Sequence, residues 1–518
     1  MAFLLAAAMA LTLLTACGQQ KKPRFVLRTY STFGEESDRE AYAAIIREYT
    51  KTHRNAVIND TTTTRANSYK MSLSLASTYR GAGAPDVIYY TAMKDMSELS
   101  DFFMTVDEIR ADYPHFAEGV SEAALSSAAA DDGGRYCIPV RGDWQGIIVN
   151  AALFRRSALK VPTTWEDVLR AAEHFQKNRE ISLFANSLTD SGALMEYLVR
   201  ALGGEAAVRS AMEGQPDDCW QRALRAVAQL DELNAFPLLP PEAFDYLISP
   251  SDLRHTSDEK QDDPVALFNA GKAAILLIDN SMCGSIDADI DSRYIALPPY
   301  VTFSTVQTTT TTRFSYPTGN GEPGAVYPRE TGNTLPPTQP PASGSGETAS
   351  ADAASTSSTT VPTTRPSGIS PSDTEKSPAS EQGLYVNFAE GFYITKKAYY
   401  NSEKREDMLA LVEAFLQEDN NLSLCGDQSR VPALTSVSRK AEDKLTEKSN
   451  LYRAVIQSVQ SADSFLVSTQ TQENRFFWNH CAMTVAYFSK GVLTQEEALR
   501  LIGDTQSTAA DFHQQRKT

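Results

Sequence analysis

Four consecutive residues in the sequence combine three kinds of side chain that bind small polar molecules. In Arg141-Gly142-Asp143-Trp144, the guanidinium can donate paired hydrogen bonds, the carboxylate can accept them, and the indole offers a flat apolar face. Such a set suits a ligand that presents hydroxyl groups together with C–H faces. The Arg-Gly-Asp tripeptide also occurs in cell-adhesion proteins, but tripeptides are common by chance and this one alone does not indicate adhesion.

The sequence lacks the usual motifs of catalysis and metal binding. It has no G-x-S-x-G elbow, no H-E-x-x-H pair and no P-loop. The six histidines never fall at metal-ligand spacing, and no C-x-x-C pair is present. We therefore predict no catalytic residue, no metal and no cofactor. Acidic residues are abundant, so a two-carboxylate glycosidase stays open as an alternative.

The charge and length of the chain restrict its partners and its architecture. Lys and Arg total 48 and Asp and Glu total 65, which gives a formal net charge of −17 over 518 residues. This balance argues against a nucleic-acid or anionic-membrane binder. Beyond residue 16, no apolar run approaches the roughly 20 residues that cross a bilayer. The length corresponds to about three domains.

The N-terminus has the features of an export signal. Residues 2–16 are uncharged and mostly apolar, and they lead into Leu14-Thr15-Ala16-Cys17. This end resembles a bacterial lipobox, in which the cysteine receives a diacylglycerol and becomes the mature N-terminus. The resemblance implies a signal peptide over 1–16, a lipid anchor on Cys17, a spacer over 17–24 and a place on the outer face of the cell membrane. A buried helix with an incidental cysteine is the alternative.

The remaining cysteines do not form a disulfide framework. Lipidation of the first would leave five at wide spacing, an odd number. We expect buried free thiols, with one bridge left open. The five are Cys137, Cys219, Cys283, Cys425 and Cys481.

A long segment of biased composition separates two parts that contain regular patterns. Ser, Thr, Pro and Gly make up 48 of the 79 residues in 304–382, too polar a composition to form a core, so we predict disorder there. The flanking parts, 25–303 and 383–518, alternate short apolar runs with helical patterns, which predicts an α/β protein. Strands are expected at 25–30, 86–90 and 146–149. Helical signals are the apolar series Tyr42, Ile45, Ile46 and Tyr49, and capping boxes at Thr163–Glu166, before Trp165, Val168, Leu169 and Ala172, and at Thr494–Glu497.

These pieces, taken in order, resemble the extracellular solute-binding proteins of bacterial ABC importers. The nearest branch is the carbohydrate-type group that includes maltose-binding protein. The match covers nearly all the chain except 304–382. It rests on Leu27 to Gly34, Leu75 to Val87 with its Gly-Ala-Pro-Asp end, Gly134 to Pro139, Gly146 to Phe154, Pro162 to Glu166, Phe268 to Ala274, Phe388 to Ile394, Phe415-Leu416, Pro432-Ala433 and Gly491 to Leu499.

The resemblance implies a two-lobed, periplasmic-binding-protein-like α/β fold with hinge crossovers and a ligand cleft between the lobes. One lobe would take 25–142 and 383–425, and the other 143–303 and 426–518, with 304–382 inserted near the hinge. Open α/β sheets independently favour ligand binding at the carboxyl ends of their strands.

Candidate ligand contacts follow from both arguments. The end of the first strand brings Tyr30, Ser31 and Phe33, and alternation along 86–90 sends one of Tyr89 and Tyr90 to the core and the other to the cleft. Family members place ligand contacts after the strand 273–278, where Asp279, Asn280 and Ser281 stand, and a sugar-stacking tryptophan thirteen residues before the glycine that corresponds to Gly491, where Trp478 stands. Ordinary packing, turn formation and a core stripe are the alternatives. The predicted set is Tyr30, Ser31, Phe33, Tyr90, Arg141, Asp143, Trp144, Asp279, Asn280, Ser281 and Trp478, with Arg430 as a secondary candidate.

The resemblance implies a lipid-anchored subunit that captures a small solute, a sugar or an oligosaccharide, and delivers it to ABC permease subunits in the membrane. Two alternatives stay open. One is a surface lipoprotein enzyme that acts on glycans, and the other is a binding protein that serves a sensor system. The sequence does not name the solute.

Overall fold

The computed structural model describes twelve stretches of the chain: 25–33, 36–63, 84–91, 100–177, 180–237, 263–287, 292–295, 384–425, 429–445, 449–462, 464–470 and 474–515. The predicted signal peptide, the lipid anchor at Cys17 and the segment 304–382 lie outside these stretches. Within them, no helix combines the length and the apolar character needed to cross a bilayer.

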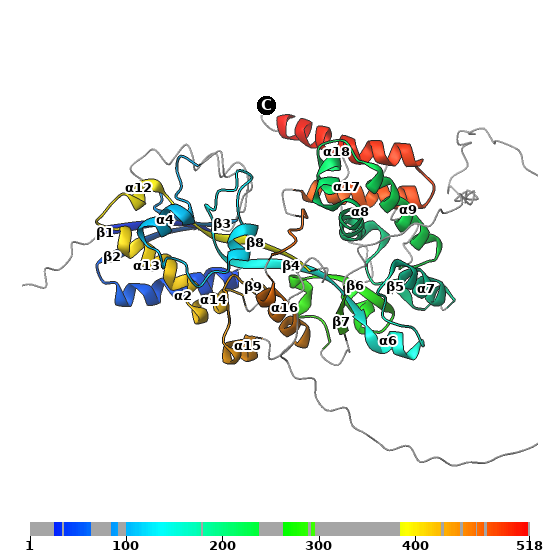
Figure 1. Cartoon of the computed structure of the whole chain (residues 1–518), viewed down its shortest axis with the longest axis horizontal. Helices are drawn as coiled ribbons and strands as arrows, with labels where there is room; N and C mark the ends of the chain where they lie inside the picture. The colour runs from blue at the N-terminus through cyan, green and yellow to red at the C-terminus, as the bar shows by residue number, and fades with distance from the viewer. Residues whose placement is uncertain are drawn as a thin grey trace, which may run out of the picture. The chain divides into compact units, whose positions relative to one another are not determined.

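The strands form one mixed sheet in the order β2-β1-β3-β8-β4-β6-β5, with β7 and β9 also paired to β4. Two long strands, β4 and β8, run antiparallel to each other along the middle (Figure 1). On one flank β2, β1 and β3 are parallel to one another, and on the other flank β5 is parallel to β6. The bounds are β1 Phe25–Thr32, β2 Ala56–Thr63, β3 Val87–Thr91, β4 Ile138–Asn150, β5 Ser182–Phe184, β6 Ala273–Asp279, β7 Ser292–Ile295, β8 Tyr385–Ile394 and β9 Val431–Pro432.

Helices follow most of the strands, as expected for an α/β protein. In the order of the chain they are α2 Glu36–Thr52, α4 Val106–Asp112, α5 Glu122–Ser127, α6 Ala151–Arg156, α7 Trp165–Gln176, the short 3₁₀ helix η2 Leu188–Asp190, α8 Gly192–Met212, α9 Asp218–Glu232, α10 Pro264–Asn269, α11 Asn280–Cys283, α12 Lys396–Tyr399, α13 Arg405–Leu416, α14 Glu418–Cys425, α15 Arg439–Leu445, α16 Asn450–Ser461, α17 Arg475–Ser489 and α18 Gln495–Gln515.

The capping boxes predicted from sequence give one confirmation and one correction. Before α18, Thr494 Oγ1 accepts from the Glu497 amide and Glu497 Oε2 accepts from the Thr494 amide, at 3.2 and 2.7 Å, as predicted. At α7 the predicted pair Thr163–Glu166 is wrong by one residue. Thr164 is the N-cap, and its Oγ1 accepts from the Asp167 amide at 3.2 Å. Capping from Thr164 leaves Trp165 as the first helical residue, buried against the core.

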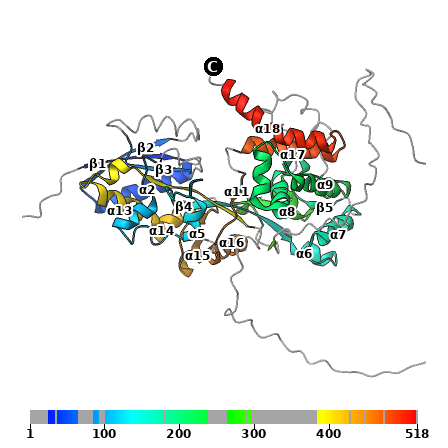
Figure 2. The same cartoon turned by 45° about the horizontal axis from the view of Figure 1, so that its top comes forward.

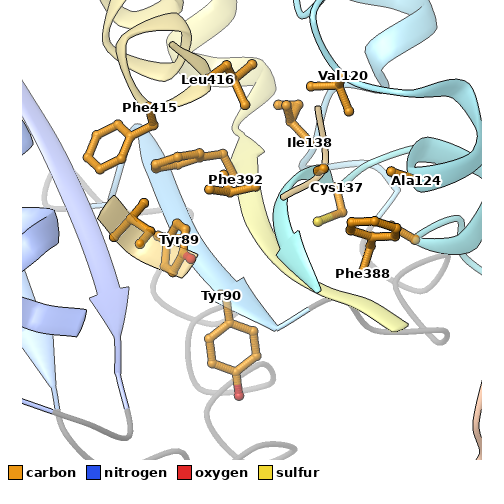
Figure 3. Packing of buried hydrophobic residues seen from close by; sticks show 14 of the residues in the cluster. Tyr89, Tyr90, Val120, Ala124, Cys137, Ile138, Phe388, Phe392, Phe415 and Leu416 are labelled. Carbon is orange, nitrogen blue, oxygen red and sulfur yellow. The ribbon is translucent and has the colours of Figure 1, made fainter. Parts of the chain in front are cut away.

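The first core cluster is rich in aromatic rings. The ring of Tyr89 lies 5.2 Å from that of Phe33 and 5.0 Å from that of Phe392, and Phe392 lies 4.8 Å from Phe415. Figure 3 shows Tyr89 facing this group while the ring of Tyr90, the next residue, points away from it. The two rings therefore point in different directions, but both tyrosines are at least nine-tenths buried in this first core cluster. The expectation that one of them faces a ligand cleft stays a prediction.

The second core cluster lies between the end of β4, strands β5 and β6, and the helices α6–α9, α17 and α18. The indoles of Trp220 on α9 and Trp478 on α17 stack with centroids 5.9 Å apart. Helix α17 also contacts α8 and α18, and Figure 2 shows these four helices beside one another. Strand β6 takes part in both clusters, with Leu276 and Ile278 in the first and Ile275 and Leu277 in the second. The predicted lobe boundaries stay a prediction.

The five described cysteines are free thiols, as expected. All except Cys219 are buried. Burial raises the pKa of the Cys137 and Cys425 thiols to about 12. These thiols are therefore protonated and unreactive at neutral pH.

Candidate functional site

The strand directions bring carboxyl ends from both flanks of the sheet to the middle of β4. On one flank β3 ends at Thr91, which pairs with Glu390 of β8, and Glu390 in turn pairs with Arg141 of β4. On the other flank β6 ends at Asp279, which pairs with Gln145 of β4. Because α/β sheets bind ligands at the carboxyl ends of their strands, residues 141–145 are where a ligand site is expected.

Arg141 is the centre of a buried ionic network. Its Nε and Nη2 approach Glu390 Oε2 at 2.8 and 2.7 Å, and its Nη1 and Nη2 donate to the two carboxylate oxygens of Asp38 at 2.8 and 2.6 Å. Nη1 also donates to the carbonyl of Leu424. Four of the five N–H groups of the guanidinium donate hydrogen bonds in these contacts, and Nη2 also forms an ion pair with Glu390. With its side chain 1% exposed, Arg141 is not accessible to a ligand in this structure.

Arg430 extends this network toward solvent. Its Nε donates to Asp143 Oδ1 at 2.8 Å, and its Nη1 lies 3.1 Å from Asp38 and 3.4 Å from Glu390. Nη2 has no hydrogen-bond partner among the described residues. The side chain of Asp143 is 45% exposed, so the Asp143–Arg430 pair forms the accessible edge of the network.

A tyrosine hydroxyl completes the network. The hydroxyl of Tyr89 donates to Glu390 Oε2 at 3.2 Å. Burial raises the pKa of Tyr89 well above its usual value, so the hydroxyl stays protonated and remains a donor. Glu390 is therefore held from two sides, by Arg141 and by Tyr89.

Sequence reasoning missed two members of the network, Asp38 and Glu390. The sequence held a usable signal for Glu390, because it is the only charged residue in the mostly apolar strand 385–394. Asp38 lies in the first turn of α2, where an acidic residue is expected for helix stability alone. Nothing in the sequence separates that ordinary role from its contact with two arginines.

The predicted residues at the end of β1 are buried. Ser31 Oγ lies 2.9 Å from Thr62 Oγ1 on the neighbouring strand β2. The ring of Phe33 packs 5.0 Å from that of Tyr42. Tyr30 and Tyr90 keep 8% and 5% of their surface exposed, so they lie at the margin of the packed core. Their contact with a ligand stays a prediction.

Trp144 and the turn after β6 are joined by hydrogen bonds across the sheet. The Trp144 indole Nε1 donates to the carbonyl of Ser429 at 2.7 Å, and its backbone amide donates to Asn280 Oδ1 at 3.4 Å. Asp279 caps α11 by accepting from the amides of Ser281 and Met282 at 2.9 and 3.2 Å. These residues thus have structural partners, and a further role toward a ligand stays a prediction.

Trp478 lies apart from these residues, inside the second core cluster. Its ring is 3% exposed and stacks on Trp220. Its Nε1 is buried without a hydrogen-bond partner among the described residues. The stacking role toward a sugar stays a prediction, and the observed role is packing. Nowhere in the described stretches do three His, Cys, Asp or Glu side chains gather in a way that could hold a metal ion.

The sequence profile of a known family covers more than half of the chain, including Asp38, Arg141 and Asp143. Residues 34–312 match the profile described as bacterial extracellular solute-binding protein. The chain belongs to this family. A search of curated protein sequences finds no significant match.

Solved structures share the fold of this solute-binding protein. A bacterial solute receptor with an exclusive substrate preference for β-D-galactopyranose superposes with a TM-score of 0.58 at 11% identity, over 93% of this chain and 98% of that one. A chitin oligosaccharide binding protein gives 0.53 at 14% identity, over 94% and 99%. A probable secreted solute-binding lipoprotein from Streptomyces coelicolor gives 0.57 at 12% identity, over 93% and 98%. The predicted two-lobed α/β fold is therefore confirmed.

Proposed function

We propose that the protein captures a carbohydrate outside the cell and delivers it to an ABC permease in the membrane. One observation carries the proposal: strand carboxyl ends from both flanks of the sheet meet near Asp143, whose side chain is 45% exposed, and its partner Arg430, whose side chain is 14% exposed. A carboxylate beside a guanidinium, with tyrosines at the adjacent strand ends, suits a molecule with many hydroxyl groups. The carbohydrate-binding proteins with the same fold support this ligand class.

The proposal is tested by thermal unfolding of the full chain with a panel of ligands. We expect D-galactose, maltose, xylobiose or N,N′-diacetylchitobiose to raise the melting temperature by several degrees, because a ligand at 100 times its Kd stabilises the native state by about 2.7 kcal/mol. Amino acids and spermidine serve as the comparison and should leave it unchanged. If only an amino acid or spermidine raised the melting temperature, the proposed carbohydrate class would be wrong.

We also propose that Cys17 carries a lipid anchor. The lipobox resemblance at 14–17 supports this, and the family is extracellular. Replacing Cys17 with Ala should release the protein into the medium or leave the precursor uncleaved. Cys219→Ala is the matched control, because that thiol is half-buried in the folded part and should not affect retention. Membrane retention of Cys17→Ala after washing would refute the anchor.

An uptake experiment distinguishes a protein that delivers its sugar to a permease from one that presents it to a sensor. Cells that lack the chain should fail to take up whichever panel sugar binds the purified protein. Normal uptake together with a lost transcriptional response to that sugar would favour the sensor alternative.

A further inference from the structure

We propose that Arg430 and Asp143 bind two adjacent hydroxyl groups of the solute, and that the buried Arg141 positions this pair. The inference rests on the proposed carbohydrate function and specifies the ligand chemistry at the same site.

The contact between Arg430 and Asp143 leaves a donor and an acceptor side by side. Arg430 Nε donates to Asp143 Oδ1, while Asp143 Oδ2 and Arg430 Nη2 have no hydrogen-bond partner among the described residues. The Nε–H and one Nη2–H of a guanidinium project from the same edge of the group. The unused Nη2 donor therefore lies beside the Asp143 carboxylate, whose side chain is 45% exposed.

This pairing matches a vicinal diol. One hydroxyl donates its hydrogen to Asp143, and the oxygen of the adjacent hydroxyl accepts from Arg430 Nη2. A sugar that lacks either hydroxyl leaves one member of the pair unpaired in a partly desolvated site, which costs affinity. The network contains two guanidinium groups and three carboxylates, so its net charge of −1 favours a neutral diol over an anionic solute.

Arg141 acts on the pair through the two carboxylates that it shares with Arg430. It binds Asp38 on α2 and Glu390 on β8, and Arg430 Nη1 contacts the same two groups. Since Arg141 is buried and bound to both carboxylates, it fixes them and they orient Arg430. Arg141 is thus a positioning residue, and the contact with ligand belongs to Arg430.

The first experiment needs no ligand. Phenylglyoxal is added to the full chain and the modified arginines are mapped by mass spectrometry. We expect Arg430 to be modified and Arg141 to be protected. Arg209, whose side chain is 60% exposed, and Arg200, which is 7% exposed, are the reactive and protected references. Modification of Arg141 ahead of Arg430, or protection of Arg430 equal to that of Arg200, would overturn the assignment.

The second experiment measures binding of D-galactose, maltose, xylobiose and N,N′-diacetylchitobiose, and of monodeoxy forms of any that binds. Asp143→Asn and Arg430→Gln should each weaken binding by about tenfold to a hundredfold, the range expected for a lost hydrogen bond to a charged group. The wild-type protein should discriminate against at least one monodeoxy form. This discrimination should disappear in Arg430→Gln and shrink in Arg141→Lys.

The ratio of the affinities for a parent sugar and its monodeoxy form distinguishes a role in ligand recognition from a loss of folding. A loss of folding weakens the parent sugar and its deoxy form equally, and an unchanged ratio in Arg430→Gln would overturn the inference. Asp143→Asn, at a half-exposed and nearly isosteric position, covers the case in which Arg430→Gln fails to fold. If none of the four sugars binds the wild-type protein, the carbohydrate proposal fails, and the phenylglyoxal pattern alone decides the roles of the two arginines.

Discussion

Two parts of the molecule were both predicted to contact a ligand, but the structure shows different surroundings for each. Arg141 and Trp478 were both expected to touch a ligand, and both side chains are at least 97% buried. Around Arg141 the buried groups are charged, and the network reaches solvent through Asp143. Around Trp478 the buried groups are apolar, and its ring packs on Trp220. The residue type therefore shows which contacts a side chain could make with a ligand. The groups packed around it decide whether a ligand can reach it.

The largest effect is expected in the second core cluster. Trp220→Ala should lower the free energy of unfolding by about 3–5 kcal/mol, because it removes a fully buried indole that packs against Trp478 and Phe477. Urea denaturation measures this change. Tyr400→Ala, at a ring that is 69% exposed, is the control and should be nearly neutral. A loss below about 1 kcal/mol for Trp220→Ala would mean that this cluster is not a stabilising core.

The charged network should tolerate a deletion slightly better. Arg141→Met leaves Asp38 without its closest partner, and removal of one partner of a buried pair costs about 3–5 kcal/mol. We expect the lower end, about 3 kcal/mol, because Arg430 still contacts Asp38. The same denaturation assay applies. Adding Asp38→Leu to Arg141→Met should recover part of the loss, and no recovery would show that the carboxylate left unpaired was not the cause.

A third substitution, Gly391→Ala, tests the close pairing of β4 with β8. A Cβ on Gly391 of β8 would collide with the backbone carbonyl of Ile138 on β4, and backbone there cannot move freely. Gly391→Ala should therefore cost roughly 1–3 kcal/mol, as overpacking does. Gly284→Ala is the matched control, since a Cβ there meets nothing within 4 Å. Equal melting temperatures for the two variants would mean that β4 and β8 can separate at low cost.

The smallest effect is expected at the start of α7, whose first residue, Trp165, packs in the second core cluster. Thr164→Ala should cost about 1 kcal/mol by removing the N-cap, and Thr163→Ala less. Thermal unfolding of the two variants compares them. A larger loss of stability for Thr163→Ala than for Thr164→Ala would favour the Thr163–Glu166 capping box that was predicted from the sequence.

The fold was largely predictable because it depends on patterns that repeat along the chain. The apolar series in α2 buries Tyr42, Ile45 and Tyr49 as the helical period requires. The site was less predictable, because its network joins residues far apart in the sequence. Asp38, Arg141, Glu390 and Arg430 are far apart in the sequence. The pairing of β4 with β8 and β9 brings the last three together, and the packing of α2 against α13 and α14 adds Asp38. Single-sequence patterns carry no record of such pairings.

The buried thiols make this protein suitable for site-specific labelling. Cys137, Cys425, Cys283 and Cys481 are buried and their pKa values are raised by burial, so maleimide reagents at neutral pH will react with them slowly. Cys219 is the partly accessible member among the described cysteines and can be replaced by Ser. A new cysteine at an exposed position such as Ser281 would then carry a fluorescent dye next to the end of β6. The protein would become a reagentless optical sensor for whatever solute it binds.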